Sequence, residues 1–276
     1  MEEFVYKNIF GARKPKYDIR DYKLTKSTEE QLKLPESFEL DSLPDVKNQG
    51  IVNACVAHVT SSILEYHNKN ANKLSTNFIY GIQNKECGYD GQGMYLSDAC
   101  KIAYKYGDCL VEDCVGNDEV PISWEKAEAA FADAEKMKRA SSFKLRQYFT
   151  CNSPEEIKRA IYNYGPVLGS IKWWEDFNLD KNNCLYRTNS RRDYGYHAIM
   201  IYGWNETGFL CQNSWGKFWG NGGRFVCPYN IPIVEAKGLV DDEAAEFKQV
   251  KRNTFLDFIY KGINYVVNFF KNLFAR

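Results

Sequence analysis

The chain has 276 residues, which is enough for one large domain or two small ones. Its 36 basic and 36 acidic side chains give a formal net charge of +0, so the overall charge makes no case for nucleic-acid binding. An aromatic content of 15% is typical of a folded, well-packed enzyme and excludes a largely disordered chain.

The N-terminal residues 1–33 are basic and aromatic at first and then polar. The acidic start at Met1 is followed by no apolar run, so we expect no secretory signal. Nine cysteines are an odd number, and without an export signal they favour a reducing compartment such as the cytoplasm, with most cysteines as free thiols.

Four of these cysteines lie close together in the sequence: Cys87, Cys100, Cys109 and Cys114. They leave a zinc site open as an alternative to free thiols. Their spacing is irregular and includes no CxxC pair, so we expect no metal.

A polar, turn-prone run over residues 45–54 leads into Cys55. The apolar residues that follow have helical spacing: Val56, Val59, Ile63 and Leu64. The pattern predicts a loop and then a helix over 55–68, with Cys55 in the first turn. There, unpaired N–H groups and the positive end of the helix dipole favour the nucleophilic thiolate. A buried structural cysteine is the alternative.

The same predicted helix carries two further candidate groups. His58 lies one turn after Cys55, but side chains three residues apart lean the same way, so we expect it to pack rather than to act on the thiol. Glu65 and His67 are expected at the exposed end of the helix.

Residues 72–115 predict further helices and loops, with a helical stretch at 77–80. A glycine-rich loop over 87–95 precedes a helix that starts at Leu96 and ends near Gly107. Residues 116–150 predict a linker and a charged helix from Trp124, built from strong helix formers.

Residues 151–235 are richer in predicted strands. Ser153 followed by Pro154 predicts the cap and first position of a helix that reaches Tyr164. A buried strand over 167–171 follows, and later strands carry His197 and residues 208–211.

After an acidic stretch, the C-terminal extension 236–276 predicts an amphipathic helix over about 254–275. Polar residues interrupt it too often for a membrane span. It could dock on its own domain, self-associate, or bind a partner or a membrane surface.

Three motifs resemble those of the papain-like, cathepsin-type cysteine peptidases: Asn48-Gln49-Gly50 before Cys55, Gly195-Tyr196-His197-Ala198, and Gln212-Asn213-Ser214-Trp215-Gly216. They occur in the family's order. His197 follows Cys55 by 142 residues, within the family's range of about 130–150, and Asn213 follows by 158, slightly beyond it. The resemblance covers about residues 34–230 and is strongest to microbial and viral members with a short N-terminal leader.

This resemblance implies an α+β, two-lobed papain-like fold for residues 34–235. The helical lobe would span about 50–115 and the strand-rich, barrel-like lobe about 116–235, with the active site in the cleft between them. Residues 1–33 would be a short inhibitory pro-region in or near the cleft, or else an arm on the surface.

The resemblance also assigns catalytic roles. Cys55 would be the nucleophile, His197 the base that becomes an acid, and Asn213 the group that orients the imidazole. Gln49 would bind the oxyanion together with the Cys55 backbone N–H, and Trp215 would shield the His–Asn contact from water.

Substrate contacts are expected from the glycine-rich loop at Gly93 and Met94, and from Gly195 and Tyr196 beside the S2 pocket. Two departures from the family are Val56, where an aromatic residue is usual, and Val52, where relatives have a disulfide-bonded cysteine. Neither removes a chemical group.

The expected function is a cysteine endopeptidase acting on peptides or proteins without a cofactor. The alternatives are a non-hydrolytic scaffold on the same fold and an acyl transferase that uses the same triad. The richness in Asn, Lys, Tyr and Ile hints at an AT-rich genome of a bacterium, virus or protist, and an enzyme of a large DNA virus could be carried in the virion.

Overall fold

The computed structural model describes residues 10–16, 33–88, 93–115, 122–188 and 194–241. The predicted amphipathic helix over 254–275 and most of the leader lie outside the described residues.

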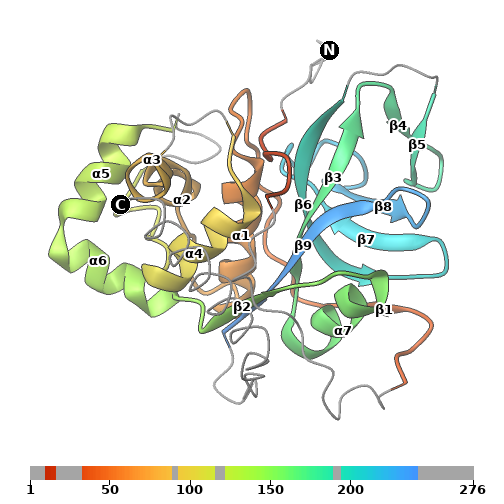
Figure 1. The fold of residues 1–276 in the computed structure, drawn as a ribbon, viewed down its shortest axis with the longest axis horizontal. Helices are drawn as coiled ribbons and strands as arrows, with labels where there is room; N and C mark the ends of the chain where they lie inside the picture. The colour runs from red at the N-terminus through yellow and green to blue at the C-terminus, as the bar shows by residue number, and fades with distance from the viewer. Residues whose placement is uncertain (1–9, 17–32, 89–92, 116–121, 189–193, 242–276) are drawn as a thin grey trace, which may run out of the picture. The chain divides into compact units, whose positions relative to one another are not determined.

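One part of the fold is helical (Figure 1). Its helices are α1 (Cys55–His67), α2 (Thr76–Gly81), α3 (Gln83–Cys87), α4 (Leu96–Lys105), α5 (Trp124–Ala132) and α6 (Ala134–Ala140), followed by a 3-10 turn, η2 (Ser141–Phe143). None of the described helices combines the length and apolar character needed to cross a membrane.

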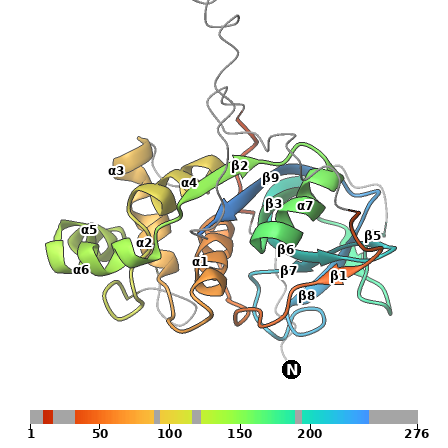
Figure 2. The same ribbon diagram turned by 90° about the horizontal axis from the view of Figure 1, so that it is seen from below.

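The other part is an antiparallel sheet with the strand order β2-β9-β3-β6-β7-β8, in which β1 also pairs with β6. Its strands are β1 (Phe38–Glu39), β2 (Gln147–Thr150), β3 (Val167–Trp174), β6 (Tyr194–Trp204), β7 (Gly208–Gln212), β8 (Arg224–Pro228) and β9 (Ile233–Val240). A separate hairpin joins β4 (Phe177–Leu179) to β5 (Leu185–Arg187). Helix α7 (Pro154–Tyr164) packs on β9, β6 and β3 (Figure 2).

The expected α+β architecture with two lobes is confirmed, but the lobes divide the chain differently. Helices α5 and α6 belong with the helical elements, because α5 packs on α2 and α6 follows it directly. The chain reaches the sheet only at β2, so the helical lobe extends beyond the boundary expected at residue 116. The expected domain end at residue 235 falls inside β9, which pairs with both β2 and β3.

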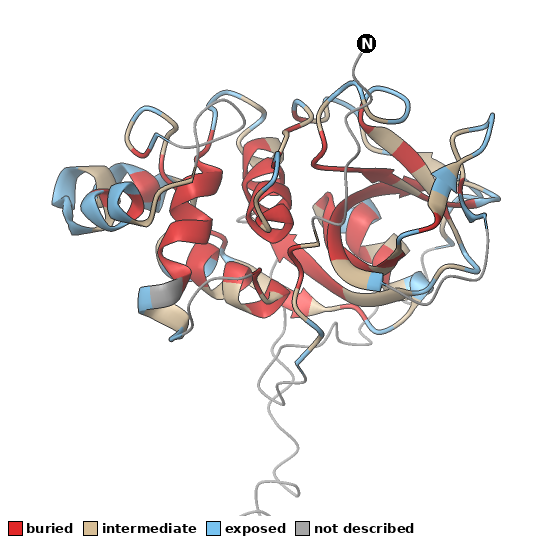
Figure 3. Ribbon diagram, turned by 90° about the horizontal axis from the view of Figure 1, so that it is seen from above, coloured by how far each residue is buried: buried red, intermediate tan, exposed pale blue. Residues whose placement is uncertain are grey.

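Helix α1 is the centre of the core (Figure 3). Every residue from Cys55 to Glu65 is buried, because α1 packs on α2 and α4 on one side and on β6 and β3 on the other. Small side chains such as Ala57 and Ser61 allow this close approach, and the Ser61 hydroxyl donates to Asp108 Oδ2 at 2.7 Å.

The end of α1 differs from the expectation. Glu65 is not exposed: its side chain is 1% accessible, and its Oε1 lies 2.7 Å from Lys47 Nζ and 2.7 Å from the Leu74 backbone N. His67 is half-buried, with Nε2 3.1 Å from the Leu239 backbone oxygen. Both side chains have partners that are distant in sequence, which helical periodicity does not reveal. His58 packs in the core as expected, with Nδ1 2.8 Å from the Ala54 oxygen.

Candidate active site

Cys55 is the first residue of α1 and is fully buried. The preceding Ala54 offers no side-chain cap, so no capping group competes for the first N–H groups of the helix. The Ala198 backbone N–H, on β6, points to the Cys55 sulfur at an N···S distance of 3.4 Å. Burial raises the pKa of the Cys55 thiol to about 11, and hydrogen bonds from the Ala198 and Gly11 backbone oppose this rise.

His197 lies on β6, next to Ala198, and is also fully buried. Its Nε2 donates to Asn213 Oδ1 at 2.7 Å, while its Nδ1 is buried without a hydrogen-bond partner. Burial lowers the pKa of His197 to about 4, and the bond to Asn213 opposes that shift. Burial thus disfavours the charged forms of both Cys55 and His197.

Asn213 follows β7, and its orientation is fixed from two sides. Its backbone N–H donates to the Gly223 oxygen at 2.9 Å, and its Oδ1 also accepts from the Ser214 N–H at 2.7 Å. Trp215 is 4% accessible, and its ring lies 4.7 Å from the His197 ring at an interplanar angle of 31°. Trp215 therefore covers the imidazole, in the position expected for the shielding residue.

Gln49 is held over the start of α1 by its neighbours. Its Nε2 donates to the Val52 oxygen at 2.9 Å, and its Oε1 accepts from the Ser214 hydroxyl at 2.6 Å. The Gln49 backbone N–H also donates to the Ser214 oxygen at 2.8 Å. Ser214 stands inside the Asn213 motif, but no pattern in the sequence marks it as the residue that positions Gln49.

The segment 10–16 of the N-terminal leader lies across these residues. The Ala12 N–H donates to the Tyr196 oxygen at 3.0 Å, on the sheet side. On the helical side, the Arg13 N–H donates to the Met94 oxygen at 2.9 Å, and the Met94 N–H donates to the Gly11 oxygen at 2.7 Å. A Cβ on Gly11 would overlap the Asn53 carbonyl, so the leader backbone touches the loop that carries the nucleophile.

The expected substrate-contact residues meet this leader segment, with one difference in detail. Met94, not Gly93, forms the backbone pairing, while the Gly93 N–H donates to the Tyr80 hydroxyl at 3.3 Å. Gly93 has a positive φ of 76°, and a Cβ there would lie 2.6 Å from the Gly11 oxygen. The absence of a side chain at position 93 therefore permits the close approach expected of this loop.

Gly195 and Tyr196 contact the leader in different ways. Tyr196 offers its backbone oxygen to Ala12. Gly195 lies against Phe10, since a Cβ on Gly195 would overlap the Phe10 ring. This contact is on the face of β6 that carries His197, two residues further along the strand.

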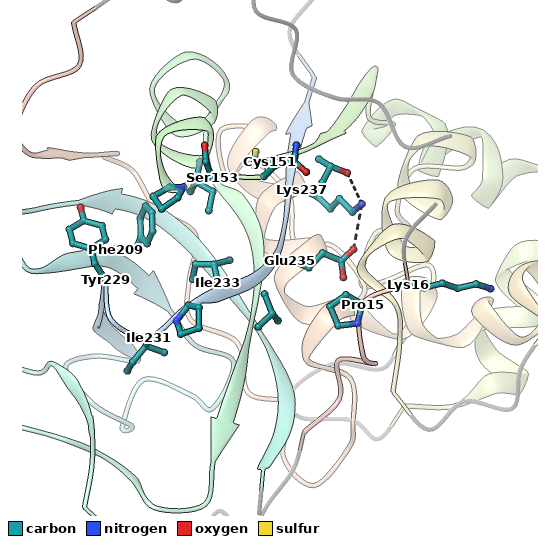
Figure 4. A pocket seen from close by; sticks show the side chains of 16 residues that line it. Pro15, Lys16, Cys151, Ser153, Phe209, Tyr229, Ile231, Ile233, Glu235 and Lys237 are labelled. Atoms are coloured by element: carbon teal, nitrogen blue, oxygen red, sulfur yellow. Dashed lines mark hydrogen bonds and ion pairs between the residues drawn. The ribbon is translucent and has the colours of Figure 1, made fainter. Parts of the chain in front are cut away.

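A cavity of about 490 Å³ elsewhere contains none of these groups (Figure 4). It lies beside α7 and the start of β9, with Pro15 and Lys16 at one end. Lys237 there donates to Thr150 Oγ1 at 2.9 Å and lies 3.4 Å from Glu235. The cleft at Cys55 is filled by the leader instead.

The described residues contain no group of three or more His, Cys, Asp or Glu side chains that could hold a metal ion. The four clustered cysteines are all described as thiols, and no three of them belong to such a group.

Comparison with known proteins agrees with this geometry. The model of the family "Papain family cysteine protease" matches residues 34–232. The chain is 27% identical to a cathepsin B-like cysteine proteinase of Caenorhabditis elegans, over 70% of this chain and 61% of that protein. It is also 27% identical to an uncharacterized peptidase C1-like protein of Acanthamoeba polyphaga mimivirus, over 80% and 81% respectively.

Solved structures show the same fold. Xylellain, a cysteine protease from Xylella fastidiosa, superposes with a TM-score of 0.71 at 20% identity, covering 86% of this chain and 97% of that one. ProCathepsin B S9 from Trypanosoma congolense gives a TM-score of 0.64 at 17% identity, covering 84% and 86%. The chain thus spans less than two thirds of the nematode relative but most of the bacterial and trypanosomal structures. With the family match extending over 34–232, this chain belongs to the papain family of cysteine proteases.

Proposed function

We propose that the protein is a cysteine endopeptidase in which Cys55, His197 and Asn213 form the catalytic triad. The observation that carries the proposal is the meeting of the three residues from α1, β6 and the end of β7, with Nε2 of His197 bonded to Asn213 Oδ1 at 2.7 Å. That bond leaves Nδ1 of His197 as the ring nitrogen free to exchange a proton with the thiol.

In the proposed reaction, His197 Nδ1 takes the thiol proton and the Cys55 sulfur attacks the scissile carbonyl carbon. The carbonyl oxygen becomes an anion, which the Cys55 backbone N–H and Gln49 Nε2 stabilise. The C–N bond then breaks, and the imidazolium gives its proton to the leaving nitrogen. Water, deprotonated by His197, releases the acyl group and restores the thiol.

Replacement of the nucleophile tests this proposal. Cys55→Ala should abolish hydrolysis of fluorogenic peptides and labelling by a peptidyl epoxide, because it removes the attacking sulfur. Cys184→Ala is the matched control, since Cys184 is a half-buried thiol on the hairpin side that lies outside the triad. Hydrolysis that persists in Cys55→Ala, with mass spectrometry locating the label elsewhere, would refute the triad.

We further infer that the leader segment 10–16 holds the enzyme latent. Gly11 lies at the nucleophile and Ala12 bridges Met94 and Tyr196, so the segment occupies the path that a substrate backbone needs. Cys55 and His197 are fully buried with the leader in place, and burial disfavours the thiolate–imidazolium pair, which is the reactive state.

Chain direction explains why the segment would resist cleavage. His197 must reach the leaving nitrogen, so the leaving-group side of the cleft is the His197 side. The leader runs from Phe10 to Arg13 at Met94, and Phe10 meets Gly195 on the face of β6 that carries His197. In this proposal Gly195 therefore borders the leaving-group side and not the S2 pocket where it was expected. The leader therefore runs opposite to a substrate whose N-terminal part pairs with the Met94 loop.

A single substitution in the full chain tests the latent state. In Gly11→Val the added side chain overlaps Asn53, so we expect the leader to leave the cleft and peptide hydrolysis to rise. Lys14→Ala, at an exposed position of the same segment, is the control. Equal activity of wild type and Gly11→Val would make the leader a structural arm.

We also propose that the enzyme works in a reducing compartment. All nine cysteines are thiols, which supports the proposal. Alkylation of protein from its natural source without prior reduction should add nine labels, and a smaller number would contradict it.

A further inference from the structure

The hydrogen bond to Asn213 holds one end of the His197 ring but only weakly restrains the plane of the ring. Nε2, which donates to Asn213 Oδ1 at 2.7 Å, lies nearer than Nδ1 to the axis of the bond that joins the ring to Cβ. Rotation about that bond therefore moves Nδ1 further than Nε2. The bond joins an sp³ to an sp² carbon, where the preference for one rotation angle is broad. Nδ1 is buried without a hydrogen-bond partner, so it provides no second restraint.

Two tryptophans contact the His197 ring at different angles. The Trp215 ring lies 4.7 Å away and is tilted by 31° to the imidazole plane. The Trp173 ring lies 5.3 Å away and stands almost perpendicular to that plane, at 80°. Each contact depends on the angle between its two rings, so rotation of the imidazole would disturb both at once. The two indoles together restrain the rotation that the hydrogen bond to Asn213 leaves free.

Trp173 reaches His197 across the sheet, whereas Trp215 comes from the loop after β7. Trp173 is the second-last residue of β3 and pairs with Gly195 of β6. His197 lies two residues further along β6 and on the same face as Gly195. An aromatic side chain is long enough to span such a diagonal between neighbouring strands. The register of β3 and β6 therefore places this indole beside the imidazole.

The position of Trp173 is set by the fold around it. Its side chain is almost completely buried, with the residue 5% exposed. Four described rings besides His197 contact it, with centroids between 4.8 Å and 5.9 Å away: Phe177, Trp215, Trp219 and Phe225. They come from β4, from the loop after β7 and from β8. Trp173 is thus held independently of His197 and provides a fixed surface for the imidazole.

We propose that Trp173 is a positioning residue, which together with Trp215 holds the imidazole plane so that Nδ1 faces the Cys55 sulfur. The inference rests on the proposed peptidase function and deepens it. Trp173 supplies no reacting atom and acts only through His197. Proton exchange between the thiol and the imidazole then depends on a side chain of β3 that lies outside the triad.

The first experiment compares two pH values at which the Cys55 thiolate depends on His197 to different degrees. In the Gly11→Val chain at about pH 5, the thiolate exists as the partner of the imidazolium, whereas at about pH 10 an accessible thiol ionises without a base beside it. Trp173→Leu should therefore slow Cys55 alkylation by iodoacetamide about five- to tenfold at the lower pH and less than about twofold at the higher pH. A change in access to the thiol would alter both rates equally.

Trp219→Leu is the matched control, because it removes the same side chain from the same group of rings. The described ring contacts of Trp219 are with Trp173, Trp215 and Phe225, and not with His197. The ratio of its two alkylation rates should equal that of the Gly11→Val parent. Trp173→Phe keeps a smaller ring, so its ratio should fall between those of the parent and Trp173→Leu. A Trp173→Leu ratio equal to that of the parent would overturn the proposal.

The same labelling experiment shows whether each variant is folded. Cys100 on α4 is fully buried and should stay unlabelled at the lower pH. If Trp173→Leu exposes Cys100, Trp173→Met takes its place, because methionine fills an irregular gap without supplying a ring. The expected ratio and the ratio that would overturn the proposal are the same for both variants.

Turnover separates positioning from substrate binding. In the Gly11→Val chain, Trp173→Leu should lower kcat about five- to tenfold and leave KM within about twofold of the parent. Trp173→Phe should recover most of the lost kcat. A rise in KM at unchanged kcat would assign Trp173 to substrate contact and overturn the positioning role.

The outcomes distinguish this inference from the peptidase proposal. If Gly11→Val hydrolyses peptides and Trp173→Leu hydrolyses them equally well, only the positioning role is overturned. If Gly11→Val hydrolyses no peptide although its Cys55 is readily alkylated at about pH 10, both are overturned.

Discussion

Displacement of the leader by Gly11→Val should change the acid–base state of the active site, and the size of this change follows from burial. With the leader docked, the pKa of Cys55 is about 11 and that of His197 about 4, both because of desolvation. A thiol with that pKa is ionised in about one molecule in 10⁴ at neutral pH and about one in 10⁶ at about pH 5. The latent enzyme should therefore react very slowly with alkylating agents in acid.

Once water reaches the pair, we expect the thiolate–imidazolium form and a Cys55 pKa of about 3–4, the value of the His-paired cysteine in papain itself and not one worked from this structure. At about pH 5 the thiolate fraction then rises about 10⁶-fold. A less basic thiolate is also a weaker nucleophile. Lowering the thiol pKa by about 7 units therefore reduces the intrinsic rate constant of the thiolate by about three orders of magnitude. The net expectation for Gly11→Val at about pH 5 is an acceleration of about a thousandfold.

The assay is timed alkylation with iodoacetamide from about pH 4 to pH 10, with the labelled fraction of Cys55 read by mass spectrometry. The wild-type rate should climb about tenfold per pH unit through the alkaline range, while the Gly11→Val rate should be nearly level between about pH 5 and pH 8. Lys14→Ala should follow wild type. The reasoning would be refuted if the wild-type alkylation rate depended on pH in the same way as the Gly11→Val rate and was merely lower at every pH. In that case only molecules whose leader had already left the cleft would react.

Three other substitutions test the framework of the site. Burial raises the pKa of Asp108 well above its usual value, so the folded state holds a proton that the unfolded chain loses above its pKa of 3.8. The free energy of unfolding therefore falls as pH rises above that value, by at most about 1.4 kcal/mol per pH unit. Asp108→Asn should flatten this dependence in urea unfolding, and an unchanged slope would contradict the assignment. Lys47→Met leaves Glu65 buried without its cation and should cost about 3–5 kcal/mol in urea unfolding, with a loss below about 1 kcal/mol arguing that the pair is solvated. Ser214→Ala removes the hydroxyl that holds Gln49 Oε1 and should lower kcat about tenfold at similar KM, whereas an effect on KM alone would assign Ser214 to substrate binding.

Local signals in the sequence predicted the start and end of a helix correctly where these depend on residues that are close in the chain. Helix α7 begins at Pro154 and ends at Tyr164 as expected, because the Ser153 hydroxyl accepts from the Glu156 N–H and proline starts the first turn. The start of α1 at Cys55 follows in the same way from the turn-prone run before it. The residues expected to catalyse were located by motif order, which local patterning alone would not have provided, and their catalytic roles stay predictions.

The expectations that differed depend on distant partners. Glu65 has the periodicity of an exposed helix end, but Lys47 and the Leu74 N–H bury it, and neither lies on α1. The leader pairs with the backbone of Met94 and not of Gly93, a register that depends on the segment lying beside the loop, and the substrate contact at Gly93 stays a prediction. Trp173 lies beyond the end of the buried strand expected over 167–171, and its place beside His197 depends on the β3–β6 register.

Covalent attachment gives the leader a thermodynamic advantage that a single hydrolysed bond removes. As part of the same chain, residues 10–16 meet the cleft at an effective concentration that is typically in the millimolar range for a short tether. Ala12 bridges Met94 and Tyr196 with only a few hydrogen bonds, so a free peptide of this sequence would bind weakly. After a cut between this segment and the peptidase, the peptide would be diluted to the protein's own concentration, about a thousandfold lower at micromolar levels. Activation would then be driven by dilution and would proceed in one direction, without any change in the contacts themselves.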